Sequence, residues 1–206
     1  MARAAQHEEV TNPYVAFSDL ALNLVFVLVF FVAAVLAVGQ AGWDQVKYRD
    51  AQKEVQDAIR NAPLSARPVI LDPKLRNDPP GAQRWAFSSR GGNLFQGSTA
   101  KLTPGGVRSL TAFARALSLV PQWRRIRIEG HTLPAKQGES EWDLSARRAS
   151  AVADLFVAKA GVPPYRLAVA ARGNQTPFNG TGSARNDPAN ERVEIVVEYA
   201  QDLEGR

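Results

Sequence analysis

The chain has 206 residues, no cysteine, two histidines and a formal net charge of +5. A chain without cysteine forms no disulfide and no thiolate metal site, and two histidines are too few for a histidine-based metal centre. The 25 basic residues are interspersed with 20 acidic ones and form no long basic run, so the composition does not predict nucleic-acid binding. The length suits one folded domain and a linker beyond an N-terminal anchor.

Residues 12–39 are the most apolar part of the chain and predict one transmembrane helix, preceded by a short tail at residues 1–11. Asn12 suits the N-cap of this helix, and Pro13 is tolerated in its first turn. The 25 residues from Tyr14 to Val38 would extend about 37 Å, which exceeds a hydrocarbon core about 30 Å thick. One span with some tilt is therefore expected.

A secretory signal peptide is the alternative for this stretch. Arg3 precedes the apolar run, and the small residues Ala37, Gly39 and Ala41 resemble a cleavage site. The run is longer than the core of an ordinary signal peptide and has an acid near its start, which favours a membrane anchor.

Asp19 lies inside the predicted span, about 7.5 Å beyond its start at the rise of an α-helix. An ionised carboxylate deep in a bilayer costs about 2.5 to 3.5 kcal/mol on insertion scales. Asn23 lies four residues further on, and Phe26 and Phe30 continue the same face, which predicts a stripe that meets another protein. Either Asp19 binds and releases a coupling ion, or it is a shallow acid that snorkels or hydrogen-bonds to a neighbouring helix.

Residues 40–83 predict a linker that begins with a helix and continues as an extended, proline-rich segment. The apolar residues of this helix are spaced three, four and three apart and form a short heptad stripe: Tyr48, Ala51, Val55 and Ala58. This stripe either pairs two copies of the chain or packs on the chain's own domain.

Residues 84–200 predict one α+β domain, a sandwich in which a small mixed sheet is covered by helices. Alternating apolar residues predict strands, and apolar residues three or four apart behind a Thr-Pro or Ser cap predict helices. The expected strands are residues 84–88, 125–129, 167–171 and 193–199, and the two expected main helices begin at Pro104 and Glu141.

Four blocks of this region resemble the signature of the OmpA-like peptidoglycan-binding domain: LFQGSTAKLTPGG, IRIEGHT, LSARRASAVADLFVAKAGVPPYRL and ANERVEI. Together with one N-terminal span and its early acid, they make the chain similar to the B subunits of ion-driven stators, of the flagellar MotB type and of Zorya anti-phage defence. The segment NPYVAFSDL resembles the ion-binding segment of these subunits, which assigns the coupling ion, H⁺ or Na⁺, to Asp19.

The resemblance implies a single-pass protein of the bacterial inner membrane, with the N-terminus in the cytoplasm and the C-terminal domain in the periplasm. The flanking charges alone weakly favour the opposite orientation, because more basic residues follow the span than precede it. The resemblance also implies a homodimer that threads a ring of a multispan MotA-like A subunit and binds peptidoglycan. It implies no cofactor other than the coupling ion.

In the family, the acid of a GHTD motif holds the ammonium of diaminopimelate in the wall peptide, and the Arg of an LSxxRA motif holds its carboxylate. Arg148 matches this Arg, and a guanidinium can grip a carboxylate in a bidentate manner. The resemblance therefore predicts these peptidoglycan-binding residues: Arg148, Leu144, Thr132, His131 and Arg192. The alternatives are a surface position for Arg148, paired with Asp143 or Asp154, and a purely structural role for His131.

The chain departs from the family at the acid, because Leu133 follows the GHT motif. Glu141 also stands where the family has an Asn before the LS pair. Asp143 or Glu139 is a candidate to replace the missing charge. Without a replacement, the ligand ammonium would be left unpaired and binding would be weaker.

The sequence contains no nucleophile and base pair and no phosphate-binding loop, so an enzyme is not expected. The main functional hypothesis is an ion-channel-forming stator subunit anchored to the cell wall. The alternative is a passive tether that fixes an envelope complex to the wall. Asp19 discriminates between the two, because a tether does not need a carboxylate in the bilayer.

Overall fold

The computed structural model describes residues 13–71, 78–79, 81–88, 92–120, 122–134, 140–178 and 186–199. The predicted tail at 1–11, the predicted cap Asn12 and the candidate acid Glu139 lie outside this part of the chain. The chain divides into two compact units, Met1–Val46 and Lys47–Arg206. Each unit is described by itself.

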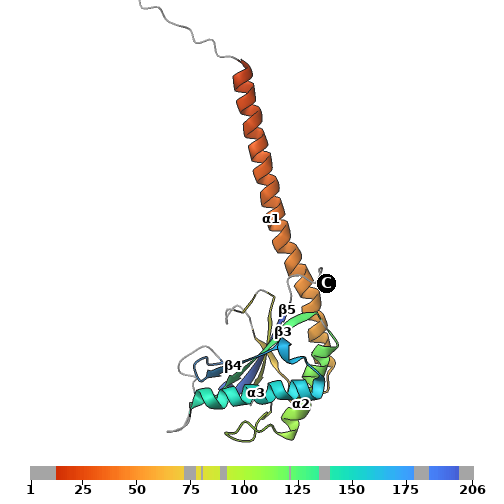
Figure 1. The fold of residues 1–206 in the computed structure, drawn as a ribbon, viewed down its shortest axis with the longest axis vertical. Helices are drawn as coiled ribbons and strands as arrows, with labels where there is room; N and C mark the ends of the chain where they lie inside the picture. Colours follow the sequence, from red (N-terminus) through yellow and green to blue (C-terminus); the bar gives the residue numbers. More distant parts are fainter. Residues whose placement is uncertain are drawn as a thin grey trace, which may run out of the picture. The chain divides into compact units, whose positions relative to one another are not determined.

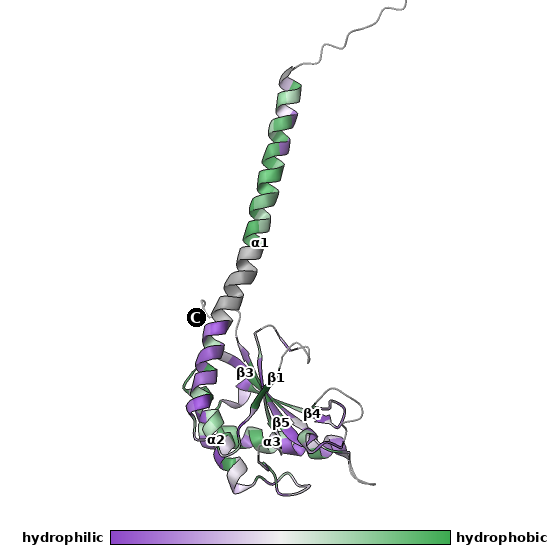
Figure 2. Cartoon of the chain, turned by 180° about the vertical axis from the view of Figure 1, so that it is seen from behind, coloured by the Kyte–Doolittle hydropathy of each residue, from purple (hydrophilic) through white to green (hydrophobic). Residues whose placement is uncertain are grey.

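The first unit is built from the N-terminal part of helix α1 (Pro13–Asn61), which is continuous over 49 residues. Its segment Tyr14–Ala37 is apolar and exposed, and its 24 residues are long enough to cross a membrane by length and composition (Figure 2). Gly39, the last residue of the predicted span, and the nearby Gly42 do not interrupt the helix. The linker helix predicted after residue 40 is therefore the continuation of the same helix.

The second unit contains one five-stranded sheet in the order β1-β2-β5-β3-β4, and Figure 1 labels its strands β3, β4 and β5. Only the β3 and β4 pair is parallel, and helix α3 connects these two strands. The other neighbours are antiparallel, so the predicted mixed sheet is confirmed. The strands are β1 (Val69–Leu71), β2 (Gln83–Ser88), β3 (Trp123–His131), β4 (Leu167–Gly173) and β5 (Arg192–Tyr199).

The two main helices form as their end signals predict. Helix α2 (Pro104–Ser118) begins where the Thr103 hydroxyl accepts a hydrogen bond from the Gly106 amide at 2.9 Å. Helix α3 (Glu141–Ala160) ends at Gly161, whose φ of 68° is the left-handed conformation common after helices. Both helices pack against the apolar face of the sheet, where Ile126 and Ile128 are fully buried as expected.

The C-terminal turns of α1 belong to the same hydrophobic core. Ala51 and Val55, two members of the predicted heptad stripe, are buried together with Ile59. The stripe thus packs on the chain's own domain, which was one of the two alternatives. β1 adds an edge strand in the region expected to be a linker, and the compact unit begins at Lys47 rather than near residue 84.

Candidate functional site

The sequence blocks of the predicted site meet at one end of the sheet. His131, the last residue of β3, pairs with Gly173 at the end of β4 and with Arg192 at the start of β5. The Thr132 amide donates to the Gly173 carbonyl at 2.9 Å, and the Gly173 amide donates to the Ser145 hydroxyl of α3 at 3.1 Å. Three chain segments far apart in sequence are thereby fixed around the first turns of α3.

Gly130 sets the distance between β3 and α3. A Cβ atom at this position would lie 2.0 Å from the backbone oxygen of Ser145, which is far inside van der Waals contact. Ser145 is fully buried and donates its hydroxyl proton to the Trp142 carbonyl at 3.0 Å. The glycine of the GHT block and the serine of the LSxxRA block are therefore explained by strand-to-helix packing.

Arg148 is buried under the loop between β2 and α2, with 1% of its side chain exposed. Its Nε donates to the Thr99 carbonyl and its Nη2 to the Gly97 carbonyl, both at 2.9 Å. The guanidinium carbon lies 4.8 Å from the centroid of the Phe95 ring, within the range of a cation–π contact. Nη2 also pairs with Oε1 of Glu191 at 2.6 Å.

The surface alternative for Arg148 is wrong in its geometry. The expected partner Asp143 pairs instead with Arg147 at 2.8 Å, on the exposed side of α3. Arg148 points inward, where its Nη1 atom is buried and has no hydrogen-bond partner among the described residues. A buried guanidinium nitrogen without a hydrogen-bond partner is rare and energetically unfavourable, so this position is a candidate for ligand binding.

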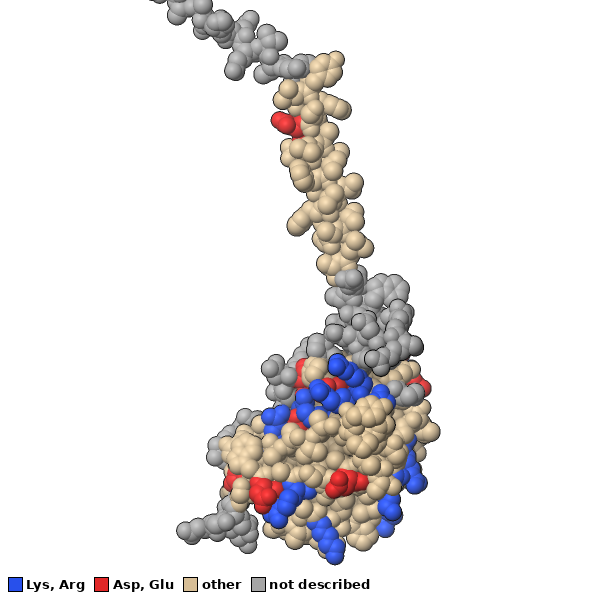
Figure 3. All heavy atoms as spheres, in the orientation of Figure 1, with Lys and Arg blue, Asp and Glu red and all other residues tan. Residues whose placement is uncertain are grey.

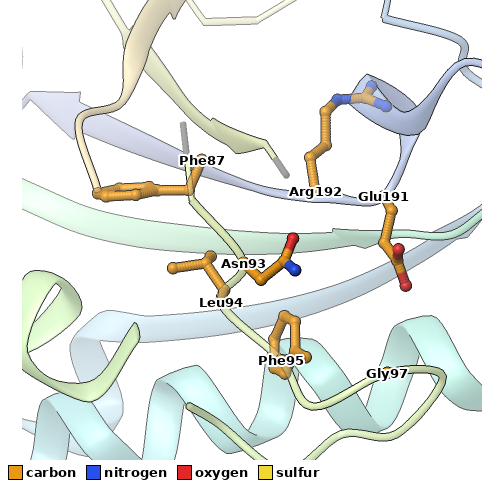
Figure 4. A pocket seen from close by; sticks show the side chains of 7 residues that line it. All are labelled: Phe87, Asn93, Leu94, Phe95, Gly97, Glu191 and Arg192. Carbon is orange, nitrogen blue, oxygen red and sulfur yellow. The ribbon is translucent and has the colours of Figure 1, made fainter. Parts of the chain in front are cut away.

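A pocket lies between the loop before α2 and the start of β5 (Figure 4), and three of its lining residues, Phe95, Gly97 and Glu191, contact Arg148. Glu191 and Arg192 point in opposite directions, with the Glu191 carboxylate directed toward Phe95 and Gly97. One third of the Glu191 side chain is exposed, whereas Arg192 is fully buried. The accessible charged group of the pocket is thus an acid. The lining residues are Phe87, Asn93, Leu94, Phe95, Gly97, Glu191 and Arg192.

His131 and Arg192 converge on Thr176 in the loop after β4. The Thr176 hydroxyl lies 3.1 Å from Nδ1 of His131, and its carbonyl accepts from Nη2 of Arg192 at 2.8 Å. Arg192 also pairs with Glu194 at 2.5 Å and lies 5.5 Å from the Phe178 ring. Both side chains are buried, so in this structure they shape the loop rather than face the pocket.

Burial lowers the pKa of His131 from 6.5 to about 4, although the nearby Glu194 carboxylate opposes the change. The Nε2 atom lies 3.6 Å from Oε1 of Glu194, which is too long for a hydrogen bond. His131 is therefore a neutral residue near neutral pH.

The remaining predicted residues lie near the same end of the sheet. Thr132 is buried, and its hydroxyl has no hydrogen-bond partner within the described part of the chain. Leu133 and Leu144 are half-buried. Their predicted contacts with a ligand, like those of His131 and Arg192, stay predictions.

The other face of the sheet carries a network of buried charges that the sequence analysis missed. Arg84 on β2 donates to Asp78, to Glu129 on β3 and to Glu194 on β5. Burial by itself would raise the pKa of Glu129, but the guanidinium groups of Arg172 and Arg84 lower it to about 2. The sequence does contain a pattern that indicates this network, namely charged residues at alternate positions of RRIRIE and VEIVVEY.

Glu129, His131 and Glu194 have ligand atoms within 4.8 Å of one another, a geometry that could hold a metal ion. Both carboxylates already accept hydrogen bonds from guanidinium groups. The cluster is therefore explained as ion pairing, and we assign no metal to it.

Asp19 is the one charged residue of the segment 14–37, and its side chain is exposed (Figure 3). Asn23, Phe26 and Phe30 lie on the same side of the helix by their spacing and are also exposed. The predicted polar stripe is thus free to meet another helix. Its role in ion binding stays a prediction.

Comparison with known proteins identifies the second unit. Residues 94–191 match the model of the OmpA family, so this part of the chain is an OmpA-like domain. The chain is also 35% identical to the outer-membrane lipoprotein YfiB of Pseudomonas aeruginosa over 115 residues, which are 55% of this chain and 66% of YfiB. A second curated relative, the uncharacterized protein YtxE of Bacillus subtilis, is matched over 46% of its length at 30% identity.

Solved structures agree with this assignment. The cell wall anchor of the T6SS from Pseudomonas aeruginosa matches with a TM-score of 0.50 and 26% identity, over 65% of this chain and 89% of that one. A putative MotB-like protein from Desulfovibrio vulgaris matches with a TM-score of 0.60 and 22% identity, over 81% of this chain and 99% of that one. The second likeness shows the fold alone, and both support the predicted OmpA-like architecture.

Proposed function

We propose that this chain is the B subunit of an ion-driven inner-membrane stator and that its OmpA-like domain anchors the stator to peptidoglycan. The observation that carries the proposal is the combination of one apolar helix bearing a single carboxylate, Asp19, with an OmpA-like domain in the same chain. The first part implies ion coupling in a membrane, and the second implies attachment to the wall.

Wall binding is supported by the domain family and by the likeness to a cell wall anchor. Arg148 has the position and chemistry that carboxylate binding requires. Two backbone carbonyls hold its guanidinium group, and its Nη1 atom lacks a partner among the described residues. A guanidinium in this arrangement can take the carboxylate of a wall peptide. The proposed reaction is binding, with no bond made or broken.

Ion coupling is supported by the position of Asp19 on an exposed apolar helix, since carboxylates within membrane spans commonly mark ion or proton pathways. One span cannot enclose an ion path, so a multispan MotA-like partner is required. In this proposal, two copies of the chain thread the partner ring, with the N-terminus in the cytoplasm and the OmpA-like domain in the periplasm. The coupling ion is H⁺ or Na⁺, and Zorya-type defence is one process such a motor would drive.

A passive tether is the second candidate, favoured by the likeness to the T6SS cell wall anchor. It shares the wall-binding domain and differs only in the role of Asp19. The two candidates are therefore separated by the membrane helix and not by the domain.

Retention on purified sacculi tests wall binding. The full chain in detergent should sediment with sacculi, and Arg148→Lys, which keeps the charge but loses the fork, should reduce retention about tenfold. Arg147→Ala is the matched control, because Arg147 is adjacent but mostly exposed and, among the described residues, pairs with Asp143 at the surface. Equal retention of the wild type and Arg148→Lys would remove Arg148 from the site.

Asp19→Asn tests ion coupling, because the amide keeps the size of the side chain but cannot exchange a proton or carry charge. In cells that co-express the multispan partner, the wild type should support ion flux across the inner membrane, and Asp19→Asn should abolish it. Ser18→Ala, at the same end of the span, is the control. Full activity of Asp19→Asn would leave the passive tether as the function.

Native mass spectrometry of the complex in detergent tests the stoichiometry. Two copies of this chain per partner ring are expected. A single copy would contradict the proposed dimer, and the Asp19→Asn variant should assemble like the wild type.

A further inference from the structure

The pocket beside Arg148 offers an acid where the family pattern lacks one. Leu133 replaces the acid of the GHT motif, and the candidate replacement Asp143 is engaged with Arg147 on the surface of α3. Glu191 is the charged residue that lies both in the pocket and on Arg148. Glu129 and Glu194 are held by guanidinium groups in the buried network.

The Arg148 and Glu191 pair is asymmetric in its burial. Arg148 is 1% exposed and Glu191 is 33% exposed, so the carboxylate stands between the guanidinium and solvent. Oε1 of Glu191 lies 2.6 Å from Nη2 of Arg148. A ligand carboxylate that takes Nη2 as well as Nη1, which has no partner among the described residues, displaces Oε1, and the displaced Glu191 side chain remains beside the ligand.

We propose that Glu191 is the ammonium-binding residue of this site and replaces the family acid missing at Leu133. This inference rests on the wall binding proposed above. The ligand class is a zwitterionic amino-acid terminus, such as the free end of diaminopimelate in a wall peptide. Its carboxylate pairs with Arg148, and its ammonium pairs with Glu191.

The charge balance gives the site its selectivity. When a zwitterion enters, the one internal ion pair is exchanged for two pairs with the ligand, so every charge keeps a partner. When a carboxylate without an ammonium enters, Glu191 is left as a negative charge beside a second negative charge. A ligand whose amino group has been blocked should therefore bind more weakly.

The side of the pocket opposite the acid suits such a ligand. The Phe95 ring, against which the Arg148 guanidinium lies, forms part of the lining, and the exposed side chain of Asn93 lies nearby (Figure 4). Asn93 can accept from an ammonium or donate to a carboxylate. Arg192 points away from the pocket and supplies no competing positive charge to it.

The test compares retention of the full chain on untreated sacculi and on sacculi whose free amino groups have been acetylated. The wild type should bind acetylated sacculi about tenfold more weakly, as expected for the loss of one charged hydrogen bond. Glu191→Gln, which is isosteric and can still accept from Arg148, should bind untreated sacculi as weakly as the wild type binds acetylated ones. It should no longer distinguish the two preparations.

Two further variants separate a binding role from a folding role. Asp143→Asn, which removes an exposed acid in the first turn of α3, the helix that carries Arg148, should bind like the wild type. The double variant Leu133→Asp with Glu191→Gln restores an acid after the GHT motif and should recover discrimination between the two preparations. A folding defect would give neither pattern, and thermal unfolding of each variant checks this directly.

The outcomes distinguish the inference from the function on which it rests. If the wild type does not bind untreated sacculi, wall binding fails and the inference fails with it. If the wild type binds but Glu191→Gln still discriminates against acetylated sacculi, only the inference is overturned. Tighter binding by Glu191→Gln would also overturn it, because Glu191 would then be a competitor for Arg148 and not a ligand group.

Discussion

The two faces of the sheet are buried with different kinds of side chain. On one face, apolar side chains of β2, β3 and β5 pack against α2, α3 and the end of α1. On the other face, the same strands bury arginines and carboxylates that pair with one another. All eight residues of β5 are buried, with apolar residues on one face and Arg192, Glu194 and Glu198 on the other.

The comparison shows that alternation in a strand does not by itself identify a solvated face. An antiparallel sheet often has one face exposed to solvent, and charged residues at alternate positions of a strand normally indicate that face. Here arginine side chains bridge the carboxylates of neighbouring strands, so that Arg84, for example, reaches two glutamates and Asp78. Pairing of this kind lets a charged face be buried, although it is strongly disrupted when one partner is removed.

Removal of the elements that complete the apolar face should have the largest effect. A fragment of residues 72–206 retains Asp78 but lacks β1 and the core residues Val55, Ile59 and Leu64. Burial of each such side chain contributes about 1.5 to 3 kcal/mol, so their loss approaches the whole stability of an ordinary domain.

Circular dichroism during urea unfolding checks this prediction, with residues 47–206 as the matched fragment. The longer fragment should unfold cooperatively and the shorter one should not. Equal midpoints would show that the segment 47–71 is a linker, as the sequence suggested, and not part of the core.

Disruption of the charged face should come next. Arg84→Met removes the guanidinium that contacts Asp78, Glu129 and Glu194, and it should lower the free energy of unfolding by about 3 to 5 kcal/mol. Arg125→Met is the control, because Arg125 is half exposed and pairs with Glu198 within the described part of the chain; about 1 kcal/mol or less is expected. Urea unfolding at pH 7 measures both, and equal effects would mean that the buried pairs add nothing beyond surface pairs.

The apolar face could be predicted from the sequence, whereas the charged face could not. Periodicity and end signals located α2, α3 and four strands to within a few residues, because capping and burial act over short distances. The pairing of Arg84 with Glu129 and Glu194 joins residues 45 and 110 positions apart and depends on strand order, which no local pattern contains. The same limit hid the pairing of β1 with β2 and left the packing of α1 on the domain as one of two alternatives, since both depend on which surface of the sheet is left open.

The candidate site likewise contains features that the sequence predicted and features that it did not. The family motifs identified Arg148, Thr132 and His131 as residues of one site, and the structure places the motif segments at one end of the sheet. They did not reveal that Arg148 is buried, nor that Glu191 is its partner, because these facts depend on the loop that closes over the arginine.

Lowering the pH should destabilise the charged face of the sheet, and the loss in free energy of unfolding should be intermediate in size. The pKa of His131 is lowered to about 4 by burial, so between pH 6.5 and 4 the unfolded chain binds a proton that the folded chain does not. Stability should therefore fall as the pH falls, by about 2 kcal/mol at pH 5. The depressed pKa of Glu129, about 2, acts in the same direction but only below about pH 4.5.

His131→Gln should flatten this dependence between pH 7 and 5, because the amide does not titrate. His7→Gln, which changes the other histidine of the chain, should keep it. Urea unfolding at a series of pH values measures the slopes. A slope in His131→Gln as steep as in the wild type would assign the pH dependence to other groups.

The smallest effect is expected where the same ion-pair chemistry occurs at the surface. Arg147 and Asp143 are 2.8 Å apart, a distance close to the 2.6 Å between Arg84 and Asp78. The surface pair is 63% and 60% exposed, and the buried pair is 1% and 0% exposed. Water screens the first pair and restores the solvation of whichever partner remains, so Arg147→Met should change the free energy of unfolding by about 0.5 kcal/mol or less. Raising the salt concentration to about 1 M should remove even that difference while leaving the cost of Arg84→Met nearly unchanged, because the Debye length falls to about 3 Å only where solvent is present. An equal response of both variants to salt would place the charged face of the sheet in contact with water.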